Sequence, residues 1–322
     1  MTPAQRAIAA FEFREPDIVP TFELEFQLPD LLLGRRLITS EDLKGTSGAE
    51  RERLLHQCAE VHLEVAERLD YSIVRPFGLE EDDAAFVIKV LSKMASGRVL
   101  VGANVGGGTF GIPSGSNMCD FVYFLHDRPE EAHERARKMA EDAIRRARKF
   151  REAGAEVFFE CTDYAFKSGP FLSPRMFSEF VAPYLARIIE VVREELGAYF
   201  VKHTDGNIMP ILDQIVALRP HAIHSIDPMA GMSLSEVKRV CGHKVALCGN
   251  VNCAILQSGT PEEAREDTRR ALREGMPGGG FFLTTSNSVF RGMPLQNYLA
   301  MLEVRKRLGR YPKPKNERSD RL

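Results

Sequence analysis

Short runs of β-branched and aromatic residues alternate with longer helical runs along most of the chain, and this alternation constrains the fold more than any other feature. Eight such β-type runs occur in about 300 residues, most of them followed by a helical run: 18–26, 71–77, 98–105, 155–161, 198–203, 221–227, 244–248 and 280–285. Repeated β-α units of this number and length are typical of a TIM barrel. No Gly-x-Gly-x-x-Gly sequence follows the first run, which disfavours a dinucleotide-binding sheet. We therefore predict an α/β protein with a single (β/α)8 TIM barrel.

The barrel is predicted to occupy residues 1–310 as one domain, and the polar, basic residues 311–322 a C-terminal tail. The clearest helical stripe starts at Pro129 and ends before Gly154, where a glycine stops it. A second helical run covers 174–196, and Pro183 inside it predicts a bend or a break.

Composition excludes several classes of protein. Lys and Arg number 43 against 45 Asp and Glu, and a chain without a basic excess is not expected to bind nucleic acid. No run of 18 apolar residues and no signal-peptide pattern is present, so we expect neither a membrane span nor secretion. Six cysteines without Cys-x-x-Cys spacing are typical of reduced thiols, and we expect a cytoplasmic enzyme or binding protein.

In a TIM barrel the residues at the C-terminal ends of the strands face the active site. The same rule, applied to the eight runs, selects a set of acids, amides, imidazoles, hydroxyls and thiols: Glu23, Glu25, Glu160, Cys161, Asp163, His203, Asp205, His224, Asp227, Cys248, Asn250, Ser286, Asn287 and Ser288. Burying a cluster of acids and imidazoles costs desolvation free energy, so such a cluster is more often found where the protein uses it. His203 and Asp205 are two residues apart on an extended segment, so they could share a metal ion, or the carboxylate could orient an imidazole.

Several stretches resemble the uroporphyrinogen decarboxylase superfamily, whose members are (β/α)8 barrels that include decarboxylases and cobalamin-linked methyltransferases. The stretches occur in the family's order over roughly the last half of the chain: 173–184 (SPRMFSEFVAPY), 203–207 (HTDGN), 247–251 (LCGNV), 256–263 (LQSGTPEE), 279–283 (GGFFL) and 294–297 (PLQN). The first half fits more loosely, through Arg6, Val19-Pro20 and the helix start at 127–131.

The chain differs from the decarboxylases themselves at the positions of their functional residues. Those enzymes carry an arginine-rich segment after the first strand, where this chain has Glu23 and Glu25. Their catalytic aspartate after the second strand is replaced by the sequence Val74-Arg75-Pro76. A substrate rich in carboxylates is not expected to enter a pocket lined by two acids.

The methyltransferase branch resembles the chain more closely, and its members hold zinc through a His-x-Cys motif, an acid and a second Cys. His203 matches the histidine and Asp227 is placed like the acid, while Asp205 stands where the first cysteine belongs. The last β-type run offers Asn287 between two serines and no cysteine, and Cys248 could supply one sulfur. A donor set richer in oxygen leaves more positive charge on zinc, which suits an alcohol, methoxy or carboxylate group.

The resemblance therefore implies a metal-assisted methyltransferase that acts with a small-molecule methyl donor or acceptor and a corrinoid, free or on a partner protein. Its zinc ligands would be His203, Asp205, Asp227 and Cys248. Catalytic roles would go to His203, Glu160 and Glu23, and substrate binding to Glu25, Asp163, Asn250 and Asn287. The alternatives are a decarboxylase that works without metal and a non-catalytic barrel that binds a tetrapyrrole. As a strand-end residue outside the apolar core, His203 is expected to tolerate replacement by Ala with little loss of stability.

Overall fold

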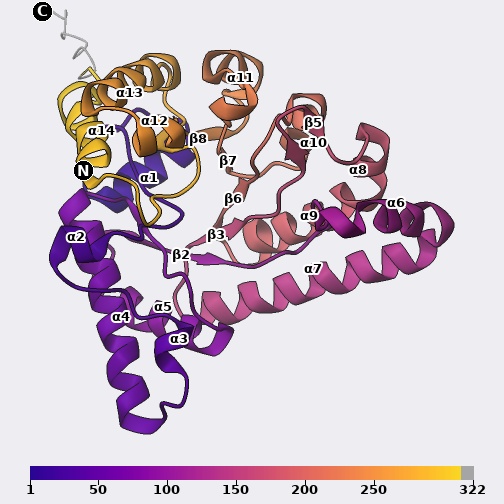
Figure 1. The fold of residues 1–322 in the computed structure, drawn as a ribbon, viewed down its shortest axis with the longest axis horizontal. Coiled ribbons are helices and arrows are strands. Elements are labelled where there is room, and N and C mark those ends of the chain that lie inside the picture. Colours follow the sequence, from indigo (N-terminus) through magenta and orange to yellow (C-terminus); the bar gives the residue numbers. More distant parts are fainter. Residues whose placement is uncertain (313–322) are drawn as a thin grey trace, which may run out of the picture.

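Seven parallel strands form one curled sheet at the centre of the computed structural model, which describes residues 1–312 (Figure 1). The two short strands β4 (Ala165–Phe166) and β5 (Gly169–Pro170) make a separate antiparallel pair. The order across the sheet is β1 (Ile73–Val74), β2 (Leu100–Asn104), β3 (Val157–Glu160), β6 (Tyr199–His203), β7 (Ala222–His224), β8 (Ala246–Val251) and β9 (Phe281–Thr285).

The first predicted β-type run, 18–26, does not form a continuous strand. It makes isolated parallel bridges from Thr21 to Leu283 and from Phe26 to Val289. The backbone N–H of Ser72 donates to the Thr21 carbonyl at 2.7 Å, and that of Leu283 donates to the Pro20 carbonyl at 3.0 Å. This segment therefore bonds to β9 on one side and to the residue that precedes β1 on the other.

Helices cover the outside of the sheet, with the following bounds: α1 Pro3–Phe11, α2 Pro29–Leu33, α3 Ser40–Leu43, α4 Gly48–Leu69, α5 Glu81–Ala95, α6 Met118–Asp127, α7 Pro129–Glu152, α8 Pro174–Phe180, α9 Ala182–Glu190, α10 Leu212–Ala217, α11 Leu234–Cys241, α12 Cys253–Ser258, α13 Pro261–Gly275 and α14 Leu295–Leu308. The predicted helix at 129–153 is confirmed as α7, and the break near Pro183 as the boundary between α8 and α9. No helix in residues 1–312 has the length and apolar character needed to cross a membrane.

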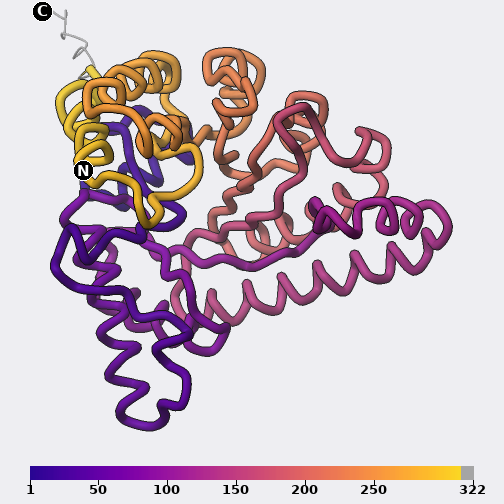
Figure 2. The backbone as a smooth tube through the Cα atoms, in the orientation of Figure 1, coloured from indigo at the N-terminus to yellow at the C-terminus, as the bar shows by residue number. Residues whose placement is uncertain are grey.

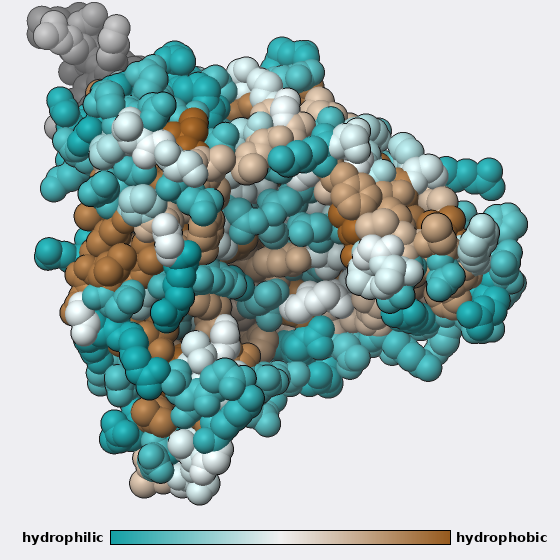
Figure 3. Space-filling model, in the orientation of Figure 1, coloured by the Kyte–Doolittle hydropathy of each residue, from teal (hydrophilic) through white to brown (hydrophobic). Residues whose placement is uncertain are grey.

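α7 and α6 extend together beyond the sheet as an arm, which the tube in Figure 2 follows at the right of the view. Apolar side chains reach the surface there (Figure 3). On α6, Tyr123 is 65% exposed. The predicted tail begins at Tyr311, whose ring is buried against the main core, and its residues 313–322 lie outside the described part.

The two faces of the sheet pack into different cores, because successive side chains of a strand point to opposite sides. Val157, Phe159 and Val201 face the inside of the curl, where α1 supplies Ala7 and Phe11. Alternate residues of the same strands join the larger core beneath the outer helices, among them Phe158 and Phe200. Because of this alternation, only strand-end residues that point to the same face of the sheet can contact one another.

Candidate active site

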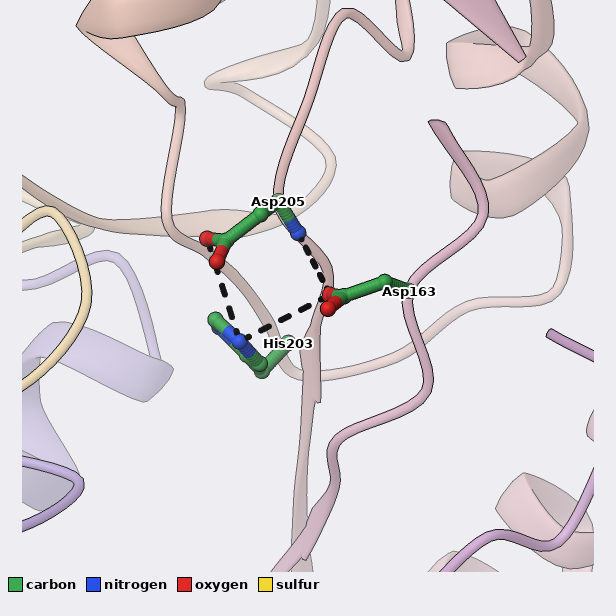
Figure 4. Close-up of side chains that lie close together, drawn as sticks. All are labelled: Asp163, His203 and Asp205. Carbon is green, nitrogen blue, oxygen red and sulfur yellow. Dashed lines mark hydrogen bonds and ion pairs between the residues drawn. The ribbon is translucent and has the colours of Figure 1, made fainter. Parts of the chain in front are cut away.

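Asp163, His203 and Asp205 converge at the C-terminal ends of β3 and β6 (Figure 4). His203 Nε2 lies 3.9 Å from Asp163 Oδ1 and 3.8 Å from Asp205 Oδ1. The backbone N–H of Asp205 also donates to Asp163 Oδ1 at 2.8 Å. One potential ligand atom from each residue lies within 4.8 Å of the other two, so the three form a compact group of possible metal ligands.

The local sequence explains why these side chains meet. His203 ends β6 and has the same parity as Val201, so its ring points to the inner side of the sheet. The chain then turns at Gly206, whose φ is +84°. A Cβ there would lie 2.1 Å from the Ala165 carbonyl oxygen, so only glycine fits this turn.

Asp205 is held by two neighbours. The Ser225 hydroxyl donates to its Oδ1 at 2.9 Å, and Asn287 Nδ2 donates to its Oδ2 at 2.5 Å. Burial, and then the nearby charge of Asp163, raise the pKa of Asp205 to about 7. Asn287, predicted to bind substrate, thus lies in the cluster and orients one of its carboxylates.

His224 supports His203 from the neighbouring strand. The two residues are paired in the β6–β7 register, and their Nδ1 atoms are 2.8 Å apart. Burial lowers the pKa of His203 well below its usual value and that of His224 to about 3. His203 itself is only 5% exposed. His203 lies outside both apolar cores, as predicted, but it is buried, and its replacement by Ala would leave His224 Nδ1 without its partner inside the protein. We therefore expect a larger loss of stability than the sequence alone suggested.

Glu23 lies away from this cluster, on the helix-covered side of the sheet. Its carboxyl group accepts hydrogen bonds from the backbone N–H and the hydroxyl of Thr285, and from the hydroxyl of Tyr298 on α14. Burial raises the pKa of Glu23 to about 8, so the group is mostly protonated at neutral pH.

Glu160 also faces the outer helices, with the same parity as Phe158. It forms a fully buried ion pair with Lys202 and accepts from the Thr162 hydroxyl. Lys202 Nζ donates in addition to the carbonyls of Thr162 and His203, each at 2.8 Å. Because every donor of Lys202 is engaged, this pair braces the segments that carry Asp163 and His203.

Three further predicted residues have contacts of their own. Asp227 accepts from the N–H groups of Gly206 and Met229, which caps a short turn. Asn250 is buried and bonded to the Ile226 carbonyl and to Arg270. Cys248 is buried in the inner core beside Phe282, and burial raises the pKa of its thiol well above the usual value. The structure thus groups Asp163, and neither Asp227 nor Cys248, with His203 and Asp205.

Glu25 lines a cavity of about 270 Å³ at the ends of β1 and β2. Arg75 and Arg146 line the same cavity, above an apolar floor that includes Phe150. The Arg75 guanidinium is nearly buried, donates to the Leu24 carbonyl at 3.0 Å and lies 3.9 Å from the Glu25 carboxylate. In the sequence, Val74-Arg75-Pro76 was interpreted only as the loss of the family's aspartate, although an arginine directly after a strand is itself a signal of a polar site.

The cluster fits a divalent metal ion by its chemistry. Two carboxylates and one imidazole are ligands that zinc accepts, and three protein ligands leave a position for a substrate atom. Burial and the charge of Asp163 both raise the pKa of Asp205, and a cation held between the two carboxylates would oppose both effects.

Comparisons with known proteins agree with this architecture. The sequence profile of the family described as uroporphyrinogen decarboxylase (URO-D) matches residues 86–308. The uroporphyrinogen decarboxylase of Pseudoalteromonas translucida (strain TAC 125) is 25% identical over 168 residues, which make up 50% of this chain but only 44% of that protein. A solved methyltransferase from Methanosarcina mazei has a similar fold, with a TM-score of 0.73 and 18% identity over 95% of this chain and 99% of that one. The profile match covers more than half of the chain, which therefore belongs to the uroporphyrinogen decarboxylase (URO-D) family.

Proposed function

We propose that this protein is a metal-assisted methyltransferase that moves a methyl group between a small molecule and a corrinoid substrate. The observation that carries the proposal is the convergence of Asp163, His203 and Asp205 at the strand ends. A zinc ion held there would act as a Lewis acid toward an alcohol, methoxy or carboxylate oxygen, because oxygen-rich ligands leave it strongly positive. The methyltransferase from Methanosarcina mazei, which shares the fold, is consistent with this class of reaction.

Other residues of the chain orient the proposed ligands or have structural roles. Ser225 and Asn287 orient Asp205, and the Asp205 backbone N–H orients Asp163. The proposal replaces the predicted ligands Asp227 and Cys248 with Asp163, because Asp163, and neither Asp227 nor Cys248, is grouped with His203 and Asp205. Glu23 and Glu160 face the outer helices and receive structural roles in place of catalytic ones.

We place the small-molecule substrate in the cavity lined by Glu25, Arg75 and Arg146, which lies, like the cluster, at the C-terminal ends of the strands. Its apolar floor suits a carbon skeleton, and its two guanidinium groups suit a carboxylate. We also propose that residues 18–26 complete the curled sheet as the eighth element of a barrel, since they bond at both of its edges.

A second candidate, decarboxylation without metal, gains support from the electrostatics. Two acids, Glu23 and Glu25, were the reason to expect that carboxylated substrates are disfavoured. Glu23 is mostly protonated and faces the outer helices, while Glu25 lies near Arg75. The cavity is therefore less acidic than the sequence suggested, and release of CO₂ from carboxylated substrates by metal-free protein would favour this reaction.

The proposed function is tested by incubating the protein with methylcobalamin and an alcohol, phenol or carboxylate acceptor. The visible spectrum of methylcobalamin reports how fast it is consumed. We expect turnover with zinc-loaded protein, loss of turnover after chelation and recovery on adding zinc. Asp163→Asn should lower turnover at least 100-fold, whereas the exposed control Asp213→Asn on α10 should not. Equal activity of chelated and zinc-loaded protein would contradict the proposal. Stabilisation by cobalamin without any turnover would favour the non-catalytic barrel instead.

A further inference from the structure

We infer that His224 is a positioning residue that fixes the tautomer of His203, so that His203 Nε2 carries no proton and presents its lone pair to Asp163 and Asp205. One chain of hydrogen-bonding contacts runs from the end of β9 through β7 to β6, and its donors and acceptors determine this tautomer. The tautomer itself does not depend on the proposed function. Its consequence for metal binding does depend on that function.

The chain of contacts starts at His224 Nε2, which faces two oxygen atoms. It lies 3.2 Å from the Thr285 carbonyl and 3.1 Å from the Thr284 hydroxyl oxygen. A carbonyl oxygen only accepts. The Thr284 hydroxyl donates its own proton to the same carbonyl at 2.8 Å, so its oxygen is free to accept. His224 Nε2 must therefore carry the proton that these two acceptors share.

The next contact is between the two imidazole rings. A neutral imidazole has one N–H, so a proton on Nε2 leaves His224 Nδ1 as an acceptor. His203 Nδ1 lies 2.8 Å from it, a distance that requires one proton between the two nitrogens. His203 must supply that proton. Both rings are buried, and burial disfavours a charged imidazole.

The last step concerns the free end of His203. With its proton on Nδ1, Nε2 holds a lone pair, and this atom faces Asp163 Oδ1 and Asp205 Oδ1 at 3.9 and 3.8 Å. The opposite tautomer would direct an N–H into the position that a cation has to occupy. Partners on the second ring nitrogen set the orientation and basicity of metal-binding histidines in this way.

The first experiment measures the tautomer directly, by ¹⁵N NMR of the full-length protein labelled on histidine and treated with chelator at neutral pH. His203→Gln identifies the signals of His203 by their loss. We expect a protonated Nδ1 and an unprotonated Nε2 on His203, with the reverse pattern on His224. A proton on His203 Nε2 in the native protein would overturn the inference, whatever the protein catalyses.

Two variants of His224 separate positioning from simple packing. His224→Asn keeps an acceptor near the position of Nδ1, whereas His224→Gln keeps a donor toward the Thr285 carbonyl and loses that acceptor. We expect His203 to keep its tautomer in His224→Asn and to lose it in His224→Gln. Zinc affinity should fall about 10- to 100-fold in His224→Gln and by less than about threefold in His224→Asn.

The outcomes distinguish this inference from the proposed function. Failure of the native protein to bind zinc, with the expected tautomer present, would remove the proposed function and leave the positioning role intact. Equal tautomer populations and equal zinc affinities in the two variants would overturn the role of His224. If either variant does not fold, the tautomer measured in the native protein still decides the question.

Discussion

The backbone N–H of Asp205 donates to Oδ1 of Asp163 across 2.8 Å, and this bond ties the loop after β6 to the loop after β3. Both carboxylates are thereby brought to the same imidazole nitrogen of His203. The site is thus assembled by two neighbouring strands of the sheet, β3 and β6, which pair directly in parallel.

His203→Ala should reduce both activity and stability. Turnover should fall by roughly two to four orders of magnitude if His203 is a metal ligand or an acid–base group. The free energy of unfolding should fall by about 1–3 kcal/mol, because buried His224 Nδ1 loses its hydrogen-bond partner. Steady-state kinetics and urea denaturation of the same preparation measure both effects. Near-normal turnover per folded molecule would remove His203 from the mechanism.

Glu23→Gln should change how stability depends on pH. The pKa of Glu23 is about 8 in the folded protein against an ordinary value of 4.5, so the folded state binds this proton more tightly. Its contribution to the free energy of unfolding is therefore complete below about pH 4.5 and is lost as pH rises through 8, at up to about 1.4 kcal/mol per pH unit.

Glutamine resembles the protonated acid and cannot ionise. The difference in stability between Glu23→Gln and the native protein should therefore grow in favour of the variant as the pH rises from about 5 to about 8, and it should level off above that. Urea denaturation across this range checks the sign, with Glu41→Gln on the exposed helix α3 as the control. A difference that stays constant with pH would show that Glu23 keeps an ordinary pKa.

The buried pair Glu160–Lys202 should be important for stability but not for chemistry. Lys202→Met leaves the Glu160 carboxylate buried without a counter-charge, and loss of one partner of such a pair costs about 3–5 kcal/mol. The double variant Glu160→Gln with Lys202→Met should recover part of this loss, since no isolated charge remains. Thermal unfolding measures the recovery. If the double variant folds normally but has lost all turnover, the original prediction that Glu160 is catalytic would stand.

The sequence predicted the parallel β-α architecture because hydrophobic periodicity reports burial along each element. It also predicted that His203 and Asp205 belong to one cluster, since both follow the same strand. It could not predict which side of the sheet a strand-end residue faces. Glu160 and His203 both end a strand, yet their parity with Phe158 and Val201 sends them to opposite faces.

Contacts between loops could not be predicted from the sequence either. Asp163 entered the sequence prediction as a substrate-binding residue, and only the fold brings its carboxylate to His203. The sequence likewise predicted no role for His224, because that role depends on acceptors two strands away on β9. The segment 18–26 has a strand-like sequence, but Pro20 lacks an N–H for a regular ladder.

Arg75→Met should weaken binding of a carboxylated substrate without changing the metal content. Arg75 lines the 270 Å³ cavity and does not belong to the group of possible ligands. We expect KM to rise about tenfold or more with kcat less affected, whereas Arg75→Lys should retain part of the affinity through its charge. Steady-state kinetics at a fixed zinc concentration measures both parameters. An unchanged KM would place the substrate elsewhere.

The metal content of the protein purified without added zinc tests the central claim most directly. Elemental analysis should find about one equivalent of zinc in the native protein and in the control Asp213→Asn, and much less in Asp163→Asn, His203→Gln and Asp205→Asn. Chelated native protein should take up one zinc ion and unfold at a higher temperature when it does. Native protein that contains no zinc, takes up none and gains no thermal stability from it would contradict the account.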